Sequence, residues 1–300
     1  MSFYNHIPNR ALGIPMVLLA GVFWSTSGII YRLIEEATAW QVLFYRSLSL
    51  LTMLFIWLGF KYKENLFKLF GYSLRLTMVG GIFLGIAFTA YIQALEHTSV
   101  ANAMFILAIA PFITALLGIV LLGEKILRYM WFCMILTAIG LSIMIGEEIS
   151  FGRGLGEFSA LIAALAFSGM TISIRANNQN DLLPTIFIAS LFASLIAASM
   201  IFFKGYSFTL KGIDLFYSCG MGIFQIGLGF ILYTAGARHL LAVELTLLSM
   251  TEIIVGPILV WIFINEYPSK IALIGGFLIL ASITVMAILG SKVNEKAYKA

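Results

Sequence analysis

Charged residues are scarce in this sequence. Asp, Glu, Lys and Arg make up only 11% of its 300 residues, whereas an ordinary soluble domain contains about 25%. Hydrophobic residues make up 61%, and the mean hydropathy is +1.01. A soluble chain of this length could not bury so much apolar surface. The composition therefore excludes an ordinary soluble protein and indicates an integral membrane protein.

Motifs of enzyme and cofactor chemistry are also missing. The two cysteines, Cys133 and Cys219, lie in apolar segments without disulfide or metal-ligand spacing. The chain has three histidines and no HExxH motif, and "GIVLLGEK" (118–125) has one residue too many before Lys125 for a P-loop. We therefore expect no enzyme, no cofactor and no metal. Without an ATP-binding segment, we expect no ATPase partner, and any active transport has to be secondary.

Long apolar runs fill the chain instead. Each is about 20 residues or more, enough to cross ~30 Å of hydrocarbon as a helix. None alternates with period two, as the strands of a barrel would. The first begins near Gly13 and is too long for a typical signal-peptide core, so we expect it to be retained as a span. The ten runs, which predict an all-α protein with ten transmembrane helices, are 13–34, 38–59, 75–95, 99–122, 126–146, 154–174, 183–203, 214–236, 240–264 and 268–290.

The distribution of Lys and Arg predicts the orientation of these helices. Ten spans place both termini on the same side. The termini and every second loop carry twelve basic residues, the opposite side carries five, and Arg46 lies inside a span, which together account for all 18. Because basic residues favour the cytoplasmic side, we expect the tails 1–12 and 291–300 in the cytoplasm of a cell membrane. Basic residues in short loops also give no sign of nucleic-acid binding.

The two halves of the sequence repeat each other. "WSTSGIIYR" (24–32) matches "FSGMTISIR" (167–175) at an offset of 143 residues (167 − 24). Further on the offset is 142, and Glu124 meets Glu266. At that offset Gly80, Gly85, Phe88, Tyr91 and His97 meet Gly222, Gly227, Phe230, Tyr233 and His239. Five spans in each copy, 13–146 and 154–290, require the second copy to be inverted. Inverted repeats are typical of transporters with a site near the membrane midplane.

Three stretches of the first half resemble the EamA family of the drug/metabolite transporter superfamily. They are Trp24–Ser25 in the first span, Arg46 in "LFYRSLSLL", and "ALEHTSVANAMFILAIAPFITALLGIVLLGEK" (94–125). The resemblance covers nearly the whole chain. It implies ten helices around a central cavity, alternating access, and transport of small metabolites such as amino acids.

The second half departs from the pattern of that family. Ala189 stands at the position that matches Arg46, and Ile253 at the position that matches Pro111. Asn265 precedes Glu266 where glycine would be usual. We therefore expect the binding chemistry of the two halves to differ.

Two carboxylates, Glu244 and Glu252, lie in the apolar run 240–264. Glu252 is at the middle of the run, where an acidic side chain costs about 3 kcal/mol on insertion scales. It therefore has to face a cavity or a partner, and one that takes up and releases a proton would couple transport to the proton gradient. Eight residues turn a helix by about 800°, so we expect both carboxyls on one broad face. Glu244 lies nearer the cytoplasm and is either a gating residue or a snorkelling carboxylate.

Arg46 is the basic residue left inside a span. It is about 12 Å from the outer end of its helix, which is a long distance to snorkel. Its guanidinium could bind a substrate carboxylate as a fork, or form a permanent ion pair with Glu252.

Neutral side chains complete the candidate site. Trp24, Tyr45, Tyr91, Phe105 and Tyr233 are candidates for an aromatic wall, which could bind a quaternary ammonium group by cation–π attraction. Gln225 and Asn102, the repeat partner of Glu244, could supply hydrogen bonds.

These residues favour a carrier that has a small molecule and protons as partners and the lipid bilayer as its surroundings. Arg46 with Glu244 and Glu252 suits a zwitterion such as an amino acid. The alternative is an organic cation such as choline, a polyamine or a drug, held by the carboxylates and Trp24. An intramembrane enzyme lacks a visible nucleophile with a base, and a channel would usually show charged rings or a filter loop.

Overall fold

The computed structural model describes residues 10–63, 74–98, 100–145, 154–177, 182–264 and 270–292, and within these ranges it contains helices and no strand. The fold is therefore all-α, as predicted. The elements are α1 (Arg10–Ser25), α2 (Ser27–Arg32), α3 (Ala39–Tyr62), α5 (Leu74–His97), α6 (Val100–Leu107), α7 (Ala110–Leu117), the π-helix η2 (Gly118–Leu122), α8 (Arg128–Ile145), α9 (Leu155–Ala176), α10 (Leu183–Phe203), α11 (Gly212–Gly220), the π-helix η3 (Met221–Leu228), α12 (Gly229–Ala237), α13 (Ala242–Ser249), α14 (Thr251–Ile264) and α15 (Lys270–Lys292).

Many of these helices are long and apolar enough to cross a membrane. Eight such segments occur in the described residues, and each matches one of the predicted runs. They are Arg10–Tyr31, Ala39–Tyr62, Leu74–His97, Leu155–Ala176, Leu183–Phe203, Gly212–Ala237, Ala242–Phe263 and Leu273–Gly290. The other two runs, 99–122 and 126–146, contain the shorter apolar helices Ala110–Leu122 and Arg128–Ile143.

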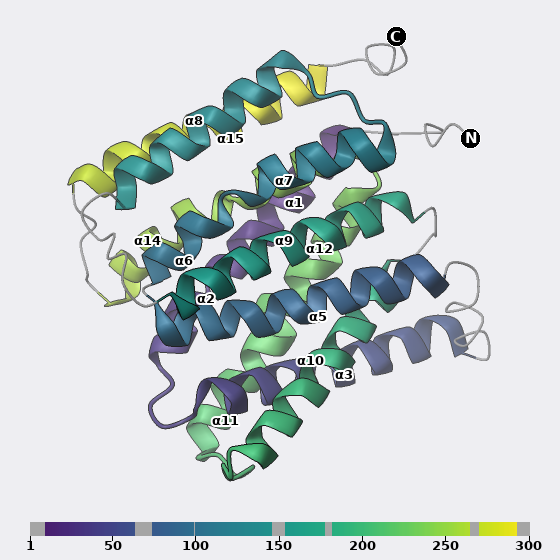
Figure 1. The fold of residues 1–300 in the computed structure, drawn as a ribbon, viewed down its shortest axis with the longest axis vertical. Helices are drawn as coiled ribbons and strands as arrows, with labels where there is room; N and C mark the ends of the chain where they lie inside the picture. The colour runs from purple at the N-terminus through teal and green to yellow at the C-terminus, as the bar shows by residue number, and fades with distance from the viewer. Residues whose placement is uncertain are drawn as a thin grey trace.

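Helices that are distant in sequence pack side by side. The pair α8 and α15 forms one edge of the molecule, and α3, α10 and α11 lie at the other edge (Figure 1). Between them, α5 packs on α9 and α1 packs on α12. The first turn of α1 and the last turn of α15 lie at the same end of the molecule, which we call the Arg10 end (Figure 1, right).

Large apolar side chains cover the periphery. Phe60 is 80% exposed, Phe203 81% and Phe216 70%. A water-soluble protein rarely exposes contiguous apolar surface of this kind, whereas hydrocarbon tails solvate it. The exposed side chains therefore agree with the apolar helices in indicating a lipid environment.

Small residues let the interior helices approach closely. A Cβ atom added to Gly222 in η3 would lie 2.0 Å from the Ser49 Oγ and 2.1 Å from the Arg46 carbonyl oxygen of α3. One added to Gly229 would lie 2.2 Å from the Trp24 Nε1 atom of α1. Glycine at these two positions allows α3 and α1 to pack directly against the η3–α12 segment, as expected for helix packing in lipid.

Candidate substrate cavity

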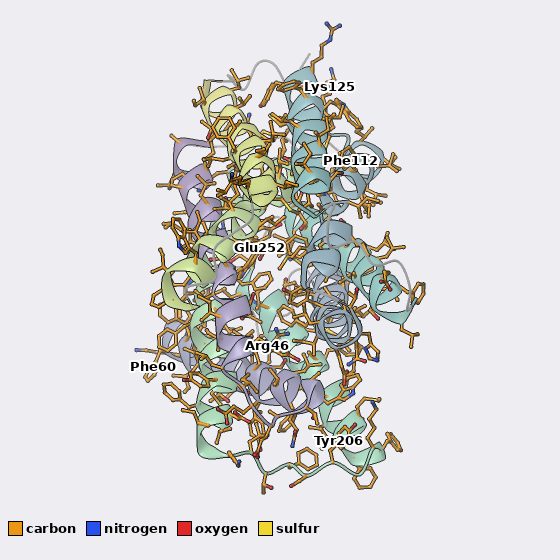
Figure 2. The ribbon with its side chains drawn as sticks, turned by 90° about the vertical axis from the view of Figure 1, so that its left-hand side faces the viewer. Arg46, Phe60, Phe112, Lys125, Tyr206 and Glu252 are labelled. Carbon is orange, nitrogen blue, oxygen red and sulfur yellow. The ribbon has the colours of Figure 1, made fainter. Side chains whose placement is uncertain are left out.

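A cavity of about 110 Å³ lies in the middle of the helix bundle. Its lining comes from residues far apart in sequence, and five of the ten candidate site residues belong to it: Trp24, Arg46, Tyr91, Gln225 and Glu252. The other lining residues include Ser27, Leu84, Phe88, Phe167, Phe230 and Ser249. Figure 2 shows Arg46 and Glu252 in the interior, with Phe60 and Tyr206 at the periphery.

Four membrane segments depart from regular α-helix where they line this cavity. The segment of α1 and α2 is interrupted at Thr26, and the Ser25 and Thr26 hydroxyls donate to the carbonyls of Val22 and Phe23. The segment of α6 and α7 is interrupted at Ala108–Ile109, just before Pro111, and that of α13 and α14 at Met250. The fourth segment contains the π-helix η3 around Gln225. Interrupted helices and π-helices recur at binding sites because they free backbone groups and re-aim side chains.

Arg46 is a buried cation. Its side chain is 2% exposed, and its Nε and Nη2 atoms have no hydrogen-bond partner in the described part of the chain. The guanidinium carbon lies 5.3 Å from the centre of the Phe88 ring, which gives a cation–π contact. Leaving a buried guanidinium with open donors is costly unless an anionic group can reach it. This geometry makes Arg46 available to a ligand in the cavity.

Glu252 lies in the first turn of α14 and lines the same cavity. Within the described residues, no ion pair joins it to Arg46. The structure thus does not contain the ion pair with Glu252 that was one of the two possibilities for Arg46; the other possibility, binding of a substrate carboxylate, stays a prediction. A cation and an acidic group therefore share one small cavity without neutralising each other directly.

Aromatic rings form one wall of the cavity. The ring centre of Trp24 lies 4.8 Å from that of Phe230 and 6.0 Å from that of Phe167. Phe88 lies 5.7 Å from Phe230. Behind them, Tyr233 is fully buried, 5.3 Å from Trp24, and shares a hydrogen bond with Thr171 at 2.8 Å. Tyr233 therefore supports the aromatic wall and is not among its lining residues.

Gln225 contributes polar atoms from η3. Its Nε2 atom donates to the Trp24 carbonyl at 3.4 Å, and its Oε1 atom is buried without a partner in the described residues. The Trp24 Nε1–H is likewise buried and unpaired there. Both groups could bind the polar part of a ligand.

Tyr45 lies outside this cavity. It lines a mostly apolar groove of about 970 Å³ between α3, α11 and η3, which also contains Trp57 and Phe60. Its hydroxyl donates to the Phe208 carbonyl. Of the other candidates, the side chains of Asn102 and Phe105 lie outside the described part of the structure.

Glu244 also lies away from the cavity, so the expectation that both carboxylates face it is not met. The reason is the interruption at Met250, which makes α13 and α14 separate helices. Glu244 is in the first turn of α13, where its Oε2 atom accepts the Leu241 N–H at 2.9 Å. Its Oε1 atom accepts from Arg10 of α1 in a buried ion pair.

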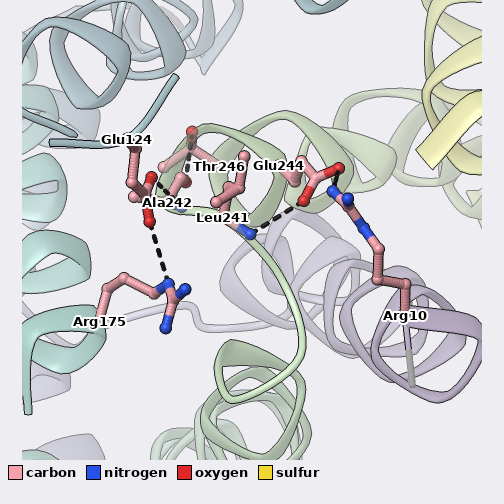
Figure 3. Close-up of polar contacts among 7 residues, drawn as sticks. All are labelled: Arg10, Glu124, Arg175, Leu241, Ala242, Glu244 and Thr246. Atoms are coloured by element: carbon pink, nitrogen blue, oxygen red, sulfur yellow. Dashed lines mark hydrogen bonds and ion pairs between the residues drawn. The ribbon is translucent and has the colours of Figure 1, made fainter. Parts of the chain in front are cut away.

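A second ion pair lies beside the first. Arg175 at the end of α9 donates to the Glu124 carboxylate at 3.0 Å, and Glu124 also accepts the Ala242 N–H at 3.0 Å (Figure 3). Burial raises the pKa of Glu124, an effect that Arg175 and the Ala242 N–H oppose. Neither ion pair was predicted from the sequence. Glu124 and Arg175 stood out only as members of the repeat, and nothing in the spacing joins Arg10 to Glu244.

Phe88, Phe167 and Phe230 were also not predicted as cavity residues. One signal could have found them, because Phe167 matches Trp24 and Phe230 matches Phe88 in the repeat. Aromatic pairs related by a repeat lie at equivalent positions around its axis, and here all four rings meet at the cavity.

Comparison with known proteins supports a transporter. Among curated proteins, the pseudopaline exporter CntI of Pseudomonas aeruginosa (strain UCBPP-PA14) is 22% identical over 273 residues, which cover 89% of this chain and 93% of the exporter. An uncharacterized transporter of Archaeoglobus fulgidus is 25% identical over 215 residues, 70% of this chain and 75% of that protein. A protein of known crystal structure shares the fold with a TM-score of 0.76 at 17% identity, covering 95% of this chain and 100% of that one.

The family itself follows from a sequence model that matches the chain twice. The model describes the EamA-like transporter family, and it matches residues 11–146 and 154–288. These two stretches contain all the lining residues of the cavity and the Glu124–Arg175 ion pair, and they agree with the resemblance found in the sequence. The chain is a multi-pass membrane protein and belongs to the EamA-like transporter family.

Proposed function

We propose that this protein is a secondary-active carrier that moves small metabolites across the cytoplasmic membrane by alternating access. The observation that carries this proposal is the central cavity, which lies where membrane helices are interrupted. Arg46 and Glu252 both line it and form no ion pair with each other. An enzyme would need a reactive group, and a channel would need a continuous path across the membrane. A binding site between interrupted helices fits a carrier.

We further propose ten membrane spans in two inverted repeats, 13–146 and 154–290. The repeat relates α1 to α9 and α12 to α5. The packing of α1 on α12 therefore has its counterpart in the packing of α9 on α5, and this supports the proposal. The helix interruptions at Ala108 and Met250 are 142 residues apart (250 − 108), which is the repeat offset. In Figure 1, the start of α6 and the end of α14 lie at the same end of the molecule. The segments α6–α7 and α13–α14 therefore run in opposite directions, as inversion requires.

The basic residues support an orientation with both termini in the cytoplasm, and the Arg10 end would then be the cytoplasmic end. Twelve Lys and Arg lie on the side of the termini and five on the other. This is the asymmetry of a protein inserted by the positive-inside rule.

For the substrate we propose a zwitterion such as an amino acid. Arg46 would bind its carboxylate, Glu252 its amino group, and the ring of Trp24 would pack against its apolar part. At about 110 Å³ the cavity is smaller than an ordinary ligand pocket, which measures roughly 300 Å³ or more. Binding therefore has to widen it. An organic cation such as choline is the second candidate, because Trp24 and Phe230 could hold its head group.

Coupling to protons is part of the same proposal. Glu252 is the acidic residue of the cavity and has no ion-pair partner in the described residues. A carboxyl group in this position can bind either a proton or an amine, so that exchange of one for the other links the two fluxes.

Counterflow in proteoliposomes tests the carrier proposal. Liposomes preloaded with an unlabelled amino acid should transiently accumulate the labelled amino acid above its external concentration, and uptake should saturate. The same assay with labelled choline ranks the two substrate classes. Labelled solute that only equilibrates, without an overshoot and without saturation, would indicate a channel and refute the proposal.

A further inference from the structure

The two ion pairs at the Arg10 end form one cluster at the start of α13. Arg10 pairs with Glu244, and Arg175 pairs with Glu124 (Figure 3). The side chains of Arg10 and Glu244 are 7% and 1% exposed, and those of Arg175 and Glu124 are 15% and 3% exposed. The cluster is thus almost entirely removed from solvent.

Both carboxylates of this cluster cap the same helix. Glu244 accepts the N–H of Leu241 and Glu124 accepts the N–H of Ala242, at the start of α13. Carboxylates stabilise a helix N-terminus by satisfying its free N–H groups and by complementing its dipole. Through their arginine partners, they connect that N-terminus to α1 and α9, so α13 is held from two sides.

The helix held in this way fills the interior between the cluster and the cavity. Every residue of α13, from Ala242 to Ser249, is buried. A helix that is buried on all faces is completely surrounded by its neighbours. At its far end, Ser249, Met250 and Glu252 line the cavity. α13 therefore lies between the cavity and the ion pairs of the Arg10 end.

We infer that the Arg10–Glu244 and Glu124–Arg175 ion pairs form a latch that holds α13 in place and keeps the cavity closed toward the Arg10 end. This inference rests on the proposed function, because a carrier has to open its site to each side in turn. Opening toward the Arg10 end requires both pairs to separate and α13 to move away from α1 and α9. The interruption at Met250 is where α13 can move relative to α14.

The latch also assigns a positioning role to Glu244, which does not touch the cavity. Glu244 acts through α13, whose last residues carry part of the cavity lining. The ion pairs thus hold the first turn of α13, and the other end of the same short helix adjoins the substrate site.

Labelling of a cysteine in the cavity tests the latch without any substrate. The background replaces Cys133 and Cys219 with alanine and introduces Ser249→Cys. A membrane-impermeant maleimide is then applied to right-side-out and inside-out vesicles, and a C-terminal tag identifies the face that corresponds to the Arg10 end. Two paired variants, Arg10→Gln with Glu244→Gln and Glu124→Gln with Arg175→Gln, remove both charges of a pair, so that no unpaired charge stays buried.

The latch predicts faster labelling from the Arg10 face in each paired variant, and the largest effect in the fourfold variant. We expect an increase of about tenfold, which corresponds to about 1.4 kcal/mol in the population of the open state. The matched control is Lys211→Gln with Glu36→Gln, which removes an ion pair that is 60% and 57% exposed at the opposite end. It should label at the background rate.

An unchanged labelling rate in the fourfold variant overturns the inference. If that variant does not yield monodisperse protein, Arg10→Lys and Arg175→Lys decide instead. They keep the charge but lose the guanidinium geometry, and they should label faster than the background; a rate equal to it also overturns the latch. The labelling assay contains no substrate. A failed counterflow assay would therefore refute the carrier proposal without changing the labelling result, so the two failures can be distinguished.

Discussion

At the scale of single residues, the site depends on a cation and a carboxyl group that share one cavity but form no pair. Arg46 is almost fully buried, and its Nε and Nη2 atoms lack partners in the described residues. A buried arginine in lipid is expensive and normally has a function. The Phe88 ring offsets part of that cost by cation–π attraction. A substrate carboxylate would offset more of it.

Arg46→Lys tests the geometry of this contact. Lysine keeps the charge but cannot form the two parallel hydrogen bonds of a guanidinium. A charge-assisted hydrogen bond contributes about 1.5–3 kcal/mol. We therefore expect the KM for amino-acid counterflow to rise by about 10- to 100-fold. Choline has no carboxylate and serves as the internal control. An equal effect on both solutes would contradict a carboxylate contact.

Glu252→Gln tests proton coupling. Glutamine has nearly the same shape but carries no charge and cannot exchange a proton. Accumulation driven by a pH gradient should therefore disappear, while counterflow should remain with a higher KM because the ionic contact with the amino group is lost. Both are measured with the same labelled amino acid. Loss of counterflow as well would place Glu252 in amine binding alone. Full retention of the pH-gradient dependence would exclude Glu252 from coupling.

At the scale of elements, the interruptions of the helices could not be read from the sequence. The runs 13–34 and 240–264 are predominantly apolar over their whole length, so hydropathy predicts continuous spans. The helical turn between Glu244 and Glu252 was therefore calculated as if no break occurred. No proline or glycine stands next to the break at Met250 in the sequence. Pro111 is the one clear local signal, because proline favours the first turn of a helix such as α7.

The contact of η3 with α3 gives a prediction at this scale. Gly222→Ala adds a methyl group 2.1 Å from the Arg46 carbonyl oxygen, so the two elements have to separate. Overpacking of this kind costs about 1–3 kcal/mol, and we expect a lower Tm together with weaker substrate binding. Gly220→Ala is the matched control, because a Cβ atom there has no neighbour within 4 Å. Equal Tm values for the two variants would contradict the close packing.

At the scale of the whole molecule, composition was sufficient to predict the class of protein. The apolar runs predicted the membrane helices because hydrocarbon imposes their length and composition. The site was predicted only partly. Trp24, Arg46 and Glu252 stood out as aromatic or charged residues near a midplane, whereas Phe167 and Phe230 look like any lipid-facing aromatic until the helices are assembled. Glu244 was assigned to the wrong surroundings because its partner, Arg10, is 234 residues away.

Equilibrium binding of a labelled amino acid to the purified protein and to two variants tests most directly whether the central cavity is the substrate site. Arg46→Gln removes the cation of the cavity, and Lys211→Gln removes an exposed cation at the surface. We expect saturable binding by the wild type and by Lys211→Gln, and loss of that binding in folded Arg46→Gln. Binding by Arg46→Gln with the wild-type affinity would show that the central cavity is not the substrate site.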